Sequence, residues 1–580
     1  MNAKEEIEKI IGTIINGRYH ELNDRKVYGT KVFVEISKEM SHGDYSTNVA
    51  LILPARQRLG AGGAKKMGKK PVEIAKEIVA KIKKQDFLER IEVAGPGFIN
   101  FYLSKEFFTK NVGQILKEKD KFGKNNNLKN QKTIVEYTDP NILKEFHIGH
   151  LMSNSIGESI SRILEFQGEK VKRVNYQGDV GIHVAKAIWG KLKANDKTWQ
   201  EAYVMGSKEY DENLDAKKEI IALNKKIYEK SDKAINKLYE QGKKESLKKF
   251  KEIYKKLGTK FDYYFFESET AGFGKKIVEE KLKRGVFEKG EKGAVVFKGE
   301  KYGLHTRVFI NSEGIPTYEA KELGLAKIKN EKYKYDKSVI ITANEQNEYF
   351  KVVLAALKEI FPELAEKTYQ IGHGMMRLPE GKMSSRAGQV ITAESLIEKA
   401  KQMILEKISD RNFSAKERNA MAEQVSVGAI KYSILRQSIG SDIIFDFDKS
   451  ISFEGDSGPY LQYSFARANS ILEKAKAEKV KSDTNLPMTS ESTNIKKSNL
   501  ERMMVYFPEI VEKAGKEYQP HYIVLYLTEL AREFNNFYAN NKIVDKSDGF
   551  SGYKVALTEA FSIIIKNGLW LIGISAPNRM

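Results

Sequence analysis

The sequence predicts an α/β protein in which a doubly wound parallel sheet forms the central of three domains. Three observations support this prediction. Short apolar, β-branched runs alternate with helical periodicity over residues 126–440, which is the pattern of a Rossmann-type sheet with crossover helices. Residues 1–125 mix strands and helices in an α+β pattern, and residues 441–580 have helical spacing almost throughout, as in an all-α bundle. At 580 residues the chain has room for roughly three to four domains.

The charge balance favours a polyanionic partner. The chain carries 98 basic and 78 acidic side chains, a formal net charge of +20, which favours nucleic acid, although a lysine-rich proteome alone also yields basic proteins. The absence of cysteine excludes disulfides, thiolate zinc sites and cysteine nucleophiles. The charged start of the chain lacks a signal-peptide core, and no run approaches the roughly 20 apolar residues that span a bilayer. We therefore expect a soluble cytoplasmic protein with no membrane partner.

In the first domain the pattern predicts an amphipathic helix over 4–17, strands over 32–36, 45–53 and 93–103, and a helix that begins at Pro71.

A glycine- and lysine-rich run at 63–70 nearly matches a phosphate-binding P-loop. Its last position is Lys70, where that motif needs the hydroxyl of Ser or Thr for magnesium. The run therefore fits a basic loop better, either a solvated insertion or a contact for RNA phosphates.

The central domain opens with a β-loop-α-β unit. Residues 133–137 have the pattern of a buried strand, a helix follows that ends at Gly168, and residues 171–176 form the next strand. The first N–H groups of such a helix lack partners and its dipole favours anions, so phosphate binds there.

His147 and His150 stand three residues apart at the start of this helix, and Gly149 between them lets a flat ligand approach the backbone. Taken alone, the two histidines fit a metal site, ordinary packed side chains or donors to a nucleotide phosphate. Only a second phosphate-handling element would favour the third interpretation.

Further along, the pattern predicts an interrupted sheet and then a bundle. The expected elements are a Lys/Glu-rich helical insertion over about 190–300 between the halves of the sheet, strands of the resumed sheet over 294–297, 306–310 and 338–342, a helix over 318–326, a loop over 374–388, a capping box at Ser414, a polar surface loop over 481–498 and bundle helices that end at Trp570 and Leu571.

A second phosphate-handling element stands at 381–388. Its glycines bracket Lys382, Met383, Ser384, Ser385 and Arg386, and such a loop of cations and hydroxyls suits a pyrophosphate leaving group. In this order, the two elements resemble the HIGH and KMSKS signatures of class I aminoacyl-tRNA synthetases.

The surrounding sequence resembles arginyl-tRNA synthetases over nearly the whole chain. The runs that carry the resemblance are 43–48 and 95–100 in the first domain, 135–141 and 175–181 around the HIGH-like turn, and 458–463, Asn535, Phe537, Tyr538 and 576–580 in the last domain. The resemblance implies an arginine–tRNA ligase that forms arginyl-adenylate from L-arginine and ATP and transfers the arginyl group to the 3′ end of tRNA(Arg). It also implies an N-terminal domain that binds the tRNA elbow and a C-terminal anticodon-binding bundle.

The resemblance further implies three groups of site residues. Catalytic and ATP-binding roles fall on Lys144, His147, Gly149, His150, Lys382, Met383, Ser384, Ser385 and Arg386. Arginine binding falls on Glu136, Asn141, Tyr318, Glu322 and Gln346, which would offer the carboxylate and neutral acceptors that a guanidinium requires. Contact with tRNA falls on Asn48, Gln462, Tyr463, Arg467, Asn535 and Tyr538.

Two positions depart from the family pattern. Glutamate stands at position 322 where the family usually has aspartate, and Ser385 stands where the class I motif has its second lysine. Members of this family often keep a lysine just ahead of the HIGH-like turn instead, and Lys144 is in that place. We therefore assign the missing charge to Lys144.

The resemblance also implies that activation needs bound tRNA, that Mg²⁺ accompanies ATP as substrate, and that the enzyme is a monomer without a protein-bound metal, zinc or organic cofactor. The alternatives are a class I synthetase for glutamine, glutamate or cysteine, a catalytically retired paralogue that only binds RNA, and a smaller nucleotidyltransferase, which would not need the two outer domains.

Overall fold

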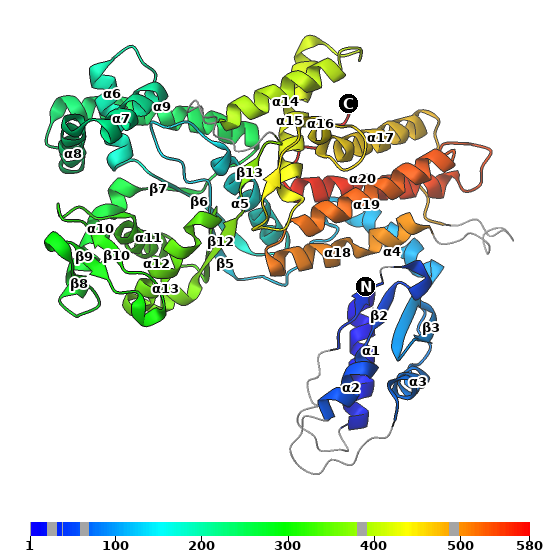
Figure 1. Ribbon diagram of the computed structural model, residues 1–580. Coiled ribbons are helices and arrows are strands. Elements are labelled where there is room, and N and C mark those ends of the chain that lie inside the picture. The colour runs from blue at the N-terminus through cyan, green and yellow to red at the C-terminus, as the bar shows by residue number, and fades with distance from the viewer. Residues whose placement is uncertain (1, 20–31, 38, 58–68, 380–390, 486–497) are drawn as a thin grey trace. The chain divides into compact units, whose positions relative to one another are not determined.

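The computed structural model describes residues 2–19, 32–37, 39–57, 69–379, 391–485 and 498–580 (Figure 1). The chain forms two compact units: the first comprises Met1–Phe122, Ala468–Pro508 and Arg532–Ile564, and the second Gly123–Arg467, Glu509–Ala531 and Ile565–Met580. Within the described ranges, none of the helices combines the length and the apolar character that a membrane span requires.

The N-terminal part of the first unit is a four-stranded antiparallel sheet with helices, which confirms the predicted α+β pattern. Its strands run in the order β1-β2-β4-β3. The elements are α1 (Ala3–Tyr19), β1 (Glu35–Ile36), β2 (Tyr45–Thr47), α2 (Val49–Gln57), α3 (Pro71–Lys81), β3 (Leu88–Ala94), β4 (Phe98–Leu103) and α4 (Lys105–Glu118).

The strand predicted over 45–53 is wrong beyond Thr47, because α2 begins at Val49. The hydroxyl of Thr47 accepts the N–H of Val49, and Val49, Ala50 and Leu53 are buried at helical spacing. A short run of apolar residues does not by itself separate a strand from a helix.

The second unit is built on a five-stranded parallel sheet, as the alternating pattern predicts. Its order is β12-β11-β5-β6-β7, with β5 (Lys132–Glu136), β6 (Lys170–Gln177), β7 (Tyr263–Phe266), β11 (Lys337–Ala343) and β12 (Thr368–His373). The strand order reverses at β5, which pairs with β6 on one side and with β11 on the other. In sheets of this kind, ligands bind beyond the carboxyl ends of the strands at the reversal point. Here that place follows Glu136 and Ala343.

Two predictions about this unit need correction. The runs at 294–297 and 306–310 form a separate antiparallel sheet of β8 (Glu288–Lys289), β9 (Val295–Phe297) and β10 (Arg307–Ile310), packed around Phe287 and Phe309, so they do not resume the parallel sheet. The insertion predicted over 190–300 is not purely helical, because it contains β7, the edge strand of the parallel sheet. Apolar runs indicate strands but not the sheet that they join.

The helices of this unit surround the sheet and bound the site. They are α5 (Ile148–Phe166), α6 (Ile182–Lys193), α7 (Trp199–Glu212), α8 (Leu214–Glu229), α9 (Lys233–Leu257), α10 (Glu267–Leu282), α11 (Tyr318–Lys332), η6 (Asn344–Gln346), α12 (Asn347–Ile360), α13 (Pro362–Lys367), α14 (Ala393–Lys407) and α15 (Ala415–Leu435). The capping box at Ser414 is confirmed: its hydroxyl accepts the N–H of Glu417 at the start of α15.

The last part of the chain is helical apart from one short strand. The strand β14 (Ile443–Ile444) pairs with β13 (Met376–Arg377), so the expectation of helices throughout from residue 441 fails there. The helices are α16 (Phe447–Ser450), α17 (Gly458–Ala477), α18 (Asn499–Glu517), α19 (His521–Asn540) and α20 (Ser551–Leu571). Most of the polar run predicted as a loop at 481–498 lies outside the described residues.

Candidate active site

The N-terminus of α5 carries the two predicted histidines in stacked contact. Their ring centroids lie 3.6 Å apart with the planes 22° from parallel, and the ring of Phe146 lies 5.2 Å from that of His150. The Nδ1 atom of His150 accepts the backbone N–H of His147 at 3.3 Å, which satisfies one donor at the helix start. A Cβ atom at Gly149 would lie 3.0 Å from Cε1 of His147. The glycine therefore lets the imidazole of His147 fold over the backbone.

Both imidazoles are neutral at neutral pH. Burial and the nearby charge of Lys144 lower the pKa of His147 to about 4. Burial, and then the charges of His147 and Lys144, lower the pKa of His150 well below its usual value. Each ring therefore offers one N–H to a phosphate rather than a positive charge. Positive charge at this turn comes from Lys144, whose Nζ atom lies 4.4 Å from the ring centre of Tyr203.

The loop between β5 and α5 is held in a strained conformation. Thr138, Asp139 and Leu143 have positive φ angles of 87°, 43° and 63°, which non-glycine residues rarely adopt. Hydrogen bonds to neighbouring elements hold the strain: Asp139 accepts the N–H of Tyr176 at 2.7 Å, and the hydroxyl of Ser246 accepts the N–H of Leu143 at 2.9 Å. This loop carries Asn141 and Lys144 and leads directly into the histidine turn.

The motif at 175–181 contacts this loop through Gly178. Asn141 forms a bridge with Gly178, where a Cβ atom would lie 2.0 Å from Oδ1 of Asn141, so only glycine fits. The buried carboxylate of Asp179 accepts hydrogen bonds from Tyr239, from Lys243 at 2.7 Å and from the backbone and hydroxyl of Ser268. Asp179 therefore ties the end of β6 to α9 and α10 and is a structural residue.

Carboxylates gather near the reversal point, and most of them already have a protein cation. Glu136 accepts from Lys329 at 2.7 Å, Glu267 from Lys321 at 2.5 Å, and Glu319 from Arg307 at 3.0 Å. Sequence reasoning predicted Glu136 but missed Glu267 and the three cations. Lys329 stands seven residues after Glu322 on one helix, so this helical spacing was an available signal.

Glu322 differs from its neighbours. Within the described part of the chain it has neither a hydrogen bond nor an ion pair. Burial and then the negative charge of Glu136 raise its pKa well above the usual value for a glutamate. The charge of Lys329, which is paired with Glu136, offsets this rise only in part, so a cationic ligand would supply further counter-charge.

Aromatic side chains line the same region. Tyr318, four residues before Glu322 on α11, is 52% exposed, and its ring lies 4.7 Å from Nζ of Lys321. Burial and the charge of Glu322 raise the pKa of Tyr349, and burial with the charges of Glu267 and Glu322 raises the pKa of Tyr176. Tyr176 and Tyr349 were not predicted. Gln346 lies exposed in η6, just beyond the carboxyl end of β11.

The histidine turn and the carboxylate cluster act on common neighbours through their charges. Burial, and then the charges of Lys144 and Lys321, lower the pKa of His183, whose Nε2 atom lies 3.3 Å from the carbonyl oxygen of Gly178. Tyr203, which contacts Lys144, also raises the pKa of Tyr318 through its charge, after burial and nearer groups. The structure therefore places the predicted phosphate-binding and guanidinium-binding residues within electrostatic reach of one another.

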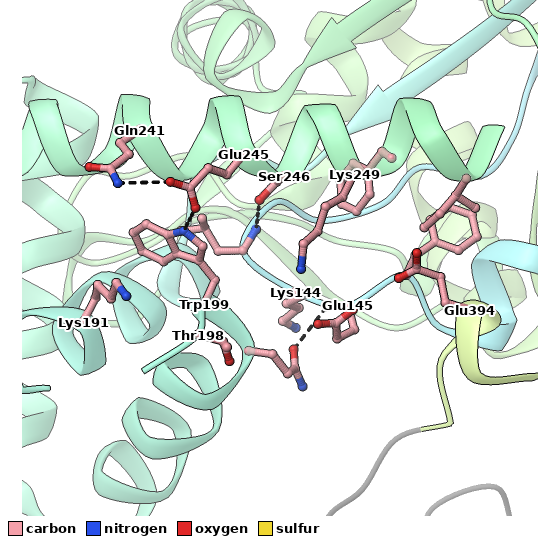
Figure 2. A pocket seen from close by; sticks show the side chains of 15 residues that line it. Lys144, Glu145, Lys191, Thr198, Trp199, Gln241, Glu245, Ser246, Lys249 and Glu394 are labelled. Carbon is pink, nitrogen blue, oxygen red and sulfur yellow. Dashed lines mark hydrogen bonds between the residues drawn. The ribbon is translucent and has the colours of Figure 1, made fainter. Parts of the chain in front are cut away.

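A cavity of about 230 Å³ adjoins the turn (Figure 2). Figure 2 shows Gln241, Glu245, Ser246 and Lys249 on α9 facing the loop that carries Lys144. Trp199 closes one side and donates to Glu245 at 2.7 Å. The cavity thus opens beside Lys144 and has cationic and anionic groups in its lining.

The second phosphate-handling element lies outside the described residues. Lys382, Met383, Ser384, Ser385 and Arg386 belong to the stretch 380–390, and most of the near P-loop at 63–70 lies in the stretch 58–68. Among the residues that are described, no group of three or more His, Asp or Glu side chains is arranged to hold a metal ion.

Three of the residues predicted to contact tRNA lie in the second unit, and they differ in exposure. The ring of Tyr463 lies 4.7 Å from the guanidinium of Arg467 and 5.7 Å from that of Arg411, which forms a partly exposed basic and aromatic cluster. Gln462, by contrast, is fully buried, and its amide donates to the carbonyl of Ser575 at 2.9 Å. That geometry makes Gln462 a structural residue, because its side chain points away from any surface that RNA could reach.

In the first unit, Asn48 is exposed before α2, Asn535 is partly buried, and Tyr538 is 43% exposed on α19. The rest of the motif at 43–48 has structural contacts. Arg502 on α18 is buried and donates to Asp44 at 2.9 Å and to the carbonyl of Gly43 at 2.5 Å.

Comparison with known proteins identifies the family. The family described as "tRNA synthetases class I (R), catalytic domain" matches residues 111–447, the "Arginyl tRNA synthetase N terminal domain" matches 3–103, and the "DALR anticodon binding domain" matches 461–580. The arginine–tRNA ligase of Clostridium perfringens is 31% identical over 98% of this chain and 99% of its own, and that of Pediococcus pentosaceus is 31% identical over the full length of both. The same fold occurs in the arginyl-tRNA synthetases of Plasmodium falciparum (TM-score 0.77, 20% identity, 100% and 99% of the two chains) and Thermus thermophilus (TM-score 0.74, 22% identity, 100% of both).

Proposed function

Because the chain belongs to the family of arginyl-tRNA synthetases, it is an enzyme of the arginine–tRNA ligase class, and we propose that it joins L-arginine to tRNA(Arg) at the site described above. In the first step, arginine and ATP give arginyl-adenylate and pyrophosphate. In the second, the arginyl group passes to the 3′ end of the tRNA for protein synthesis.

The observation that carries this proposal is the unpaired carboxylate of Glu322. Glu136, Glu267 and Glu319 each form an ion pair with a lysine or arginine, whereas Glu322 forms none among the described residues and is offset only in part by the charge of Lys329, which is paired with Glu136. A guanidinium fits this deficit, because it brings a permanent charge and a planar fork of N–H donors that a carboxylate accepts in a bidentate manner. Tyr318, Asn141 and Gln346 would supply neutral contacts. Glu136 would act mainly by fixing Lys329 and by setting the charge around Glu322.

The first step needs no protein nucleophile, because the arginine carboxylate itself attacks the α-phosphorus and pyrophosphate leaves. The protein contributes position and charge stabilisation. The neutral imidazoles of His147 and His150 would donate N–H groups to phosphate oxygens at the α5 N-terminus, where the helix dipole also favours anions. Lys144 would stabilise the departing pyrophosphate together with Lys382 and Arg386, and Mg²⁺ would enter with ATP as part of the substrate.

We further propose that residues 1–125 bind the tRNA elbow, that residues 126–440 hold the chemistry, and that residues 441–580 bind the anticodon. Tyr463, Arg467, Asn535 and Tyr538 would contact RNA, and Asn48 would contact the elbow. The enzyme would act as a cytoplasmic monomer, and its activation step would require bound tRNA.

ATP–pyrophosphate exchange, measured with each amino acid in turn and with or without total tRNA, tests this function. We expect exchange only with arginine and only when tRNA is present. Exchange with glutamine, glutamate or cysteine would instead support a synthetase of another specificity. Absence of exchange together with tRNA binding would support a non-catalytic RNA-binding protein.

A further inference from the structure

The carbonyl groups at the end of α20 are held by side chains from other helices. The carbonyls of Trp570, Leu571, Gly573 and Ser575 accept from Arg162, Ser159, Lys431 and Gln462, at 2.8 to 2.9 Å. The last carbonyls of a helix lack partners within the helix, and cations bind favourably there. Capping of one helix would explain this much and no more.

Two of these side chains also cap a second helix. Arg162 donates to the carbonyl of Gly258 at 2.9 Å, and Lys431 donates to the carbonyl of Leu257 at 2.6 Å. Leu257 and Gly258 stand at the C-terminal end of α9. Arg162 and Lys431, here called the two-cation clamp, therefore each span the ends of α9 and α20.

The clamp bears a cost that ordinary capping does not require. Lys431 is 1% exposed and has no carboxylate in its hydrogen-bonding contacts, and burial with the charge of Arg162 lowers its pKa to about 7. A buried lysine held by carbonyls alone is expensive, and an apolar residue of the same size would pack there at lower cost. Its presence indicates a role that depends on the position of the two helix ends.

Helix α5, which carries Arg162, and helix α9 lead from the clamp to the active site. Arg162 and Ser159 belong to α5, which begins at the stacked histidines, about 22 Å from Arg162 at 1.5 Å per residue. Along α9, Ser246 accepts the N–H of Leu143 in the strained loop, and Tyr239 and Lys243 hold Asp179. A shift at the clamped ends is therefore carried by rigid helices to the imidazoles and to the loop that carries Lys144.

The clamp is not buried in a continuous apolar core. Arg162 and Trp570 line two cavities, of about 830 and 530 Å³. Leu571, Ile572 and Ile574 are buried and anchor the segment by packing, but packing alone does not fix its rotation. The hydrogen bonds to the four carbonyls between Trp570 and Ser575 supply that orientation.

We propose that Arg162 and Lys431 are positioning residues for the activation step. By joining the ends of α9 and α20, the clamp sets the angle of α5 and the conformation of the 138–143 loop, so that the imidazoles and Lys144 meet the phosphates of ATP in productive geometry. The proposal rests on the proposed function for its catalytic consequence. The clamp touches no substrate, so it affects the turnover number and leaves the affinity for arginine unchanged.

Lys431→Met tests the clamp, because methionine fills a similar volume without N–H donors. Tyr432→Phe, the next residue on α15, is the matched control: it removes the buried hydrogen bond from Tyr432 to Thr528 (2.9 Å) but touches neither α9 nor the carbonyls after α20. We expect Lys431→Met to lower kcat for aminoacylation by tenfold or more with the KM for arginine within threefold of wild type. Tyr432→Phe should stay within twofold of wild type in both constants.

Hydrogen exchange supplies a readout that does not depend on activity. Amides of residues 143–151 should exchange faster in Lys431→Met than in Tyr432→Phe, although they lie beside the middle of α9 and at the N-terminal end of α5, away from the clamp. If Lys431→Met does not fold, Ser159→Ala should still lower kcat by about threefold, since it removes only the bond to Leu571 and lies closer to the histidines.

Equal effects of Lys431→Met and Tyr432→Phe, or wild-type kcat and exchange in Lys431→Met and Ser159→Ala, would overturn the clamp while the wild-type enzyme remained active. A wild-type protein that shows no arginine-dependent ATP–pyrophosphate exchange would overturn the proposed function instead. The hydrogen-exchange comparison of the variants would still decide whether the clamp positions the loop.

Discussion

Replacing Glu322 with glutamine tests the guanidinium site most directly. The substitution keeps the size of the side chain and one carbonyl oxygen but removes the charge. Because Glu136, Glu267 and Glu319 are committed to Lys329, Lys321 and Arg307, none of them is free to replace it. Of these four described glutamates, the bound guanidinium would lose the one that forms no ion pair.

The size of the effect follows from the loss of one partner in a buried charged pair. Such a loss costs 2–5 kcal/mol, and the remaining amide oxygen keeps the value near the lower end, at about 2–3 kcal/mol. At about 1.4 kcal/mol per factor of ten, the KM for arginine should rise roughly 30- to 150-fold. The kcat at saturating arginine should change little, since the guanidinium is remote from the reacting carboxylate.

The same substitution should stabilise the protein without ligand. Burial and Glu136 raise the pKa of Glu322, so the folded state holds its proton more tightly than the unfolded state does. Stability is therefore lost as the pH rises above the ordinary pKa of a glutamate, about 4.3, and the glutamine variant escapes this loss. The melting temperature of Glu322→Gln should exceed that of wild type at pH 7.5, and the two should converge near pH 4.5.

Steady-state aminoacylation and thermal unfolding at two pH values measure both effects. Glu331→Gln, an exposed glutamate further along α11, controls for a change of surface charge and should alter neither. An unchanged KM for arginine in Glu322→Gln would remove Glu322 from the binding pocket. A raised KM for arginine together with a lowered melting temperature would mean that Glu322 has a stabilising partner in the protein without ligand.

Three other predictions concern the phosphate site and the RNA surface. His150→Ala should leave tRNA binding near normal and lower aminoacylation by at least tenfold, because one transition-state donor is worth about 3 kcal/mol; full activity would contradict the assignment. The pKa of His147 is about 4 in the folded state and about 6.5 in the unfolded state, so the wild type should lose up to roughly 3 kcal/mol of stability as the pH falls from 6.5 to 4. Chemical denaturation at about pH 7 and about pH 4.5 should show a smaller loss in His147→Gln. Identical losses in the two proteins would refute the lowered pKa. Affinity for tRNA should fall by roughly 0.7 to 0.9 log units per tenfold rise in salt for each phosphate contact, and a flat salt profile would contradict an extended RNA footprint.

The order of strands and helices around the histidine turn was predictable because it depends on local pattern. Strand β5, helix α5 and strand β6 each have an unbroken periodicity, and the helix ends as predicted before Gly168, which has a φ of 88°. Membership of a sheet was not predictable. Val295–Phe297 and Arg307–Ile310 have the same apolar character as the parallel strands but pair with each other, because pairing depends on long-range partners that periodicity does not encode.

The sequence could name candidate residues of the site, but it could not predict their protonation states or their ion pairs. The motifs named both Glu136 and Glu322, with Glu322 as a departure from the family pattern, and only the fold shows that Lys329 pairs with Glu136 while Glu322 forms no ion pair among the described residues. The histidines were likewise predicted as phosphate ligands, but their neutrality follows from burial and from Lys144, which are properties of the folded state. Gln462 illustrates the opposite case, since its motif resembles the family's and its side chain is buried.

A buried glutamate without an ion pair also explains how such a site would reject other amino acids. Glutamine would leave Glu322 buried without a counter-charge, and glutamate would add a second negative charge beside Glu136, so both would bear the desolvation cost that arginine removes. Lysine carries the right charge but as one compact ammonium, which cannot engage a carboxylate through two parallel N–H bonds while it also meets Tyr318 and Asn141. Discrimination between arginine and other amino acids would thus rest on Glu322, whose negative charge the neighbouring lysines do not pair. Any substitution that frees Glu136 from Lys329 should therefore weaken selectivity between arginine and lysine before it weakens binding of ATP.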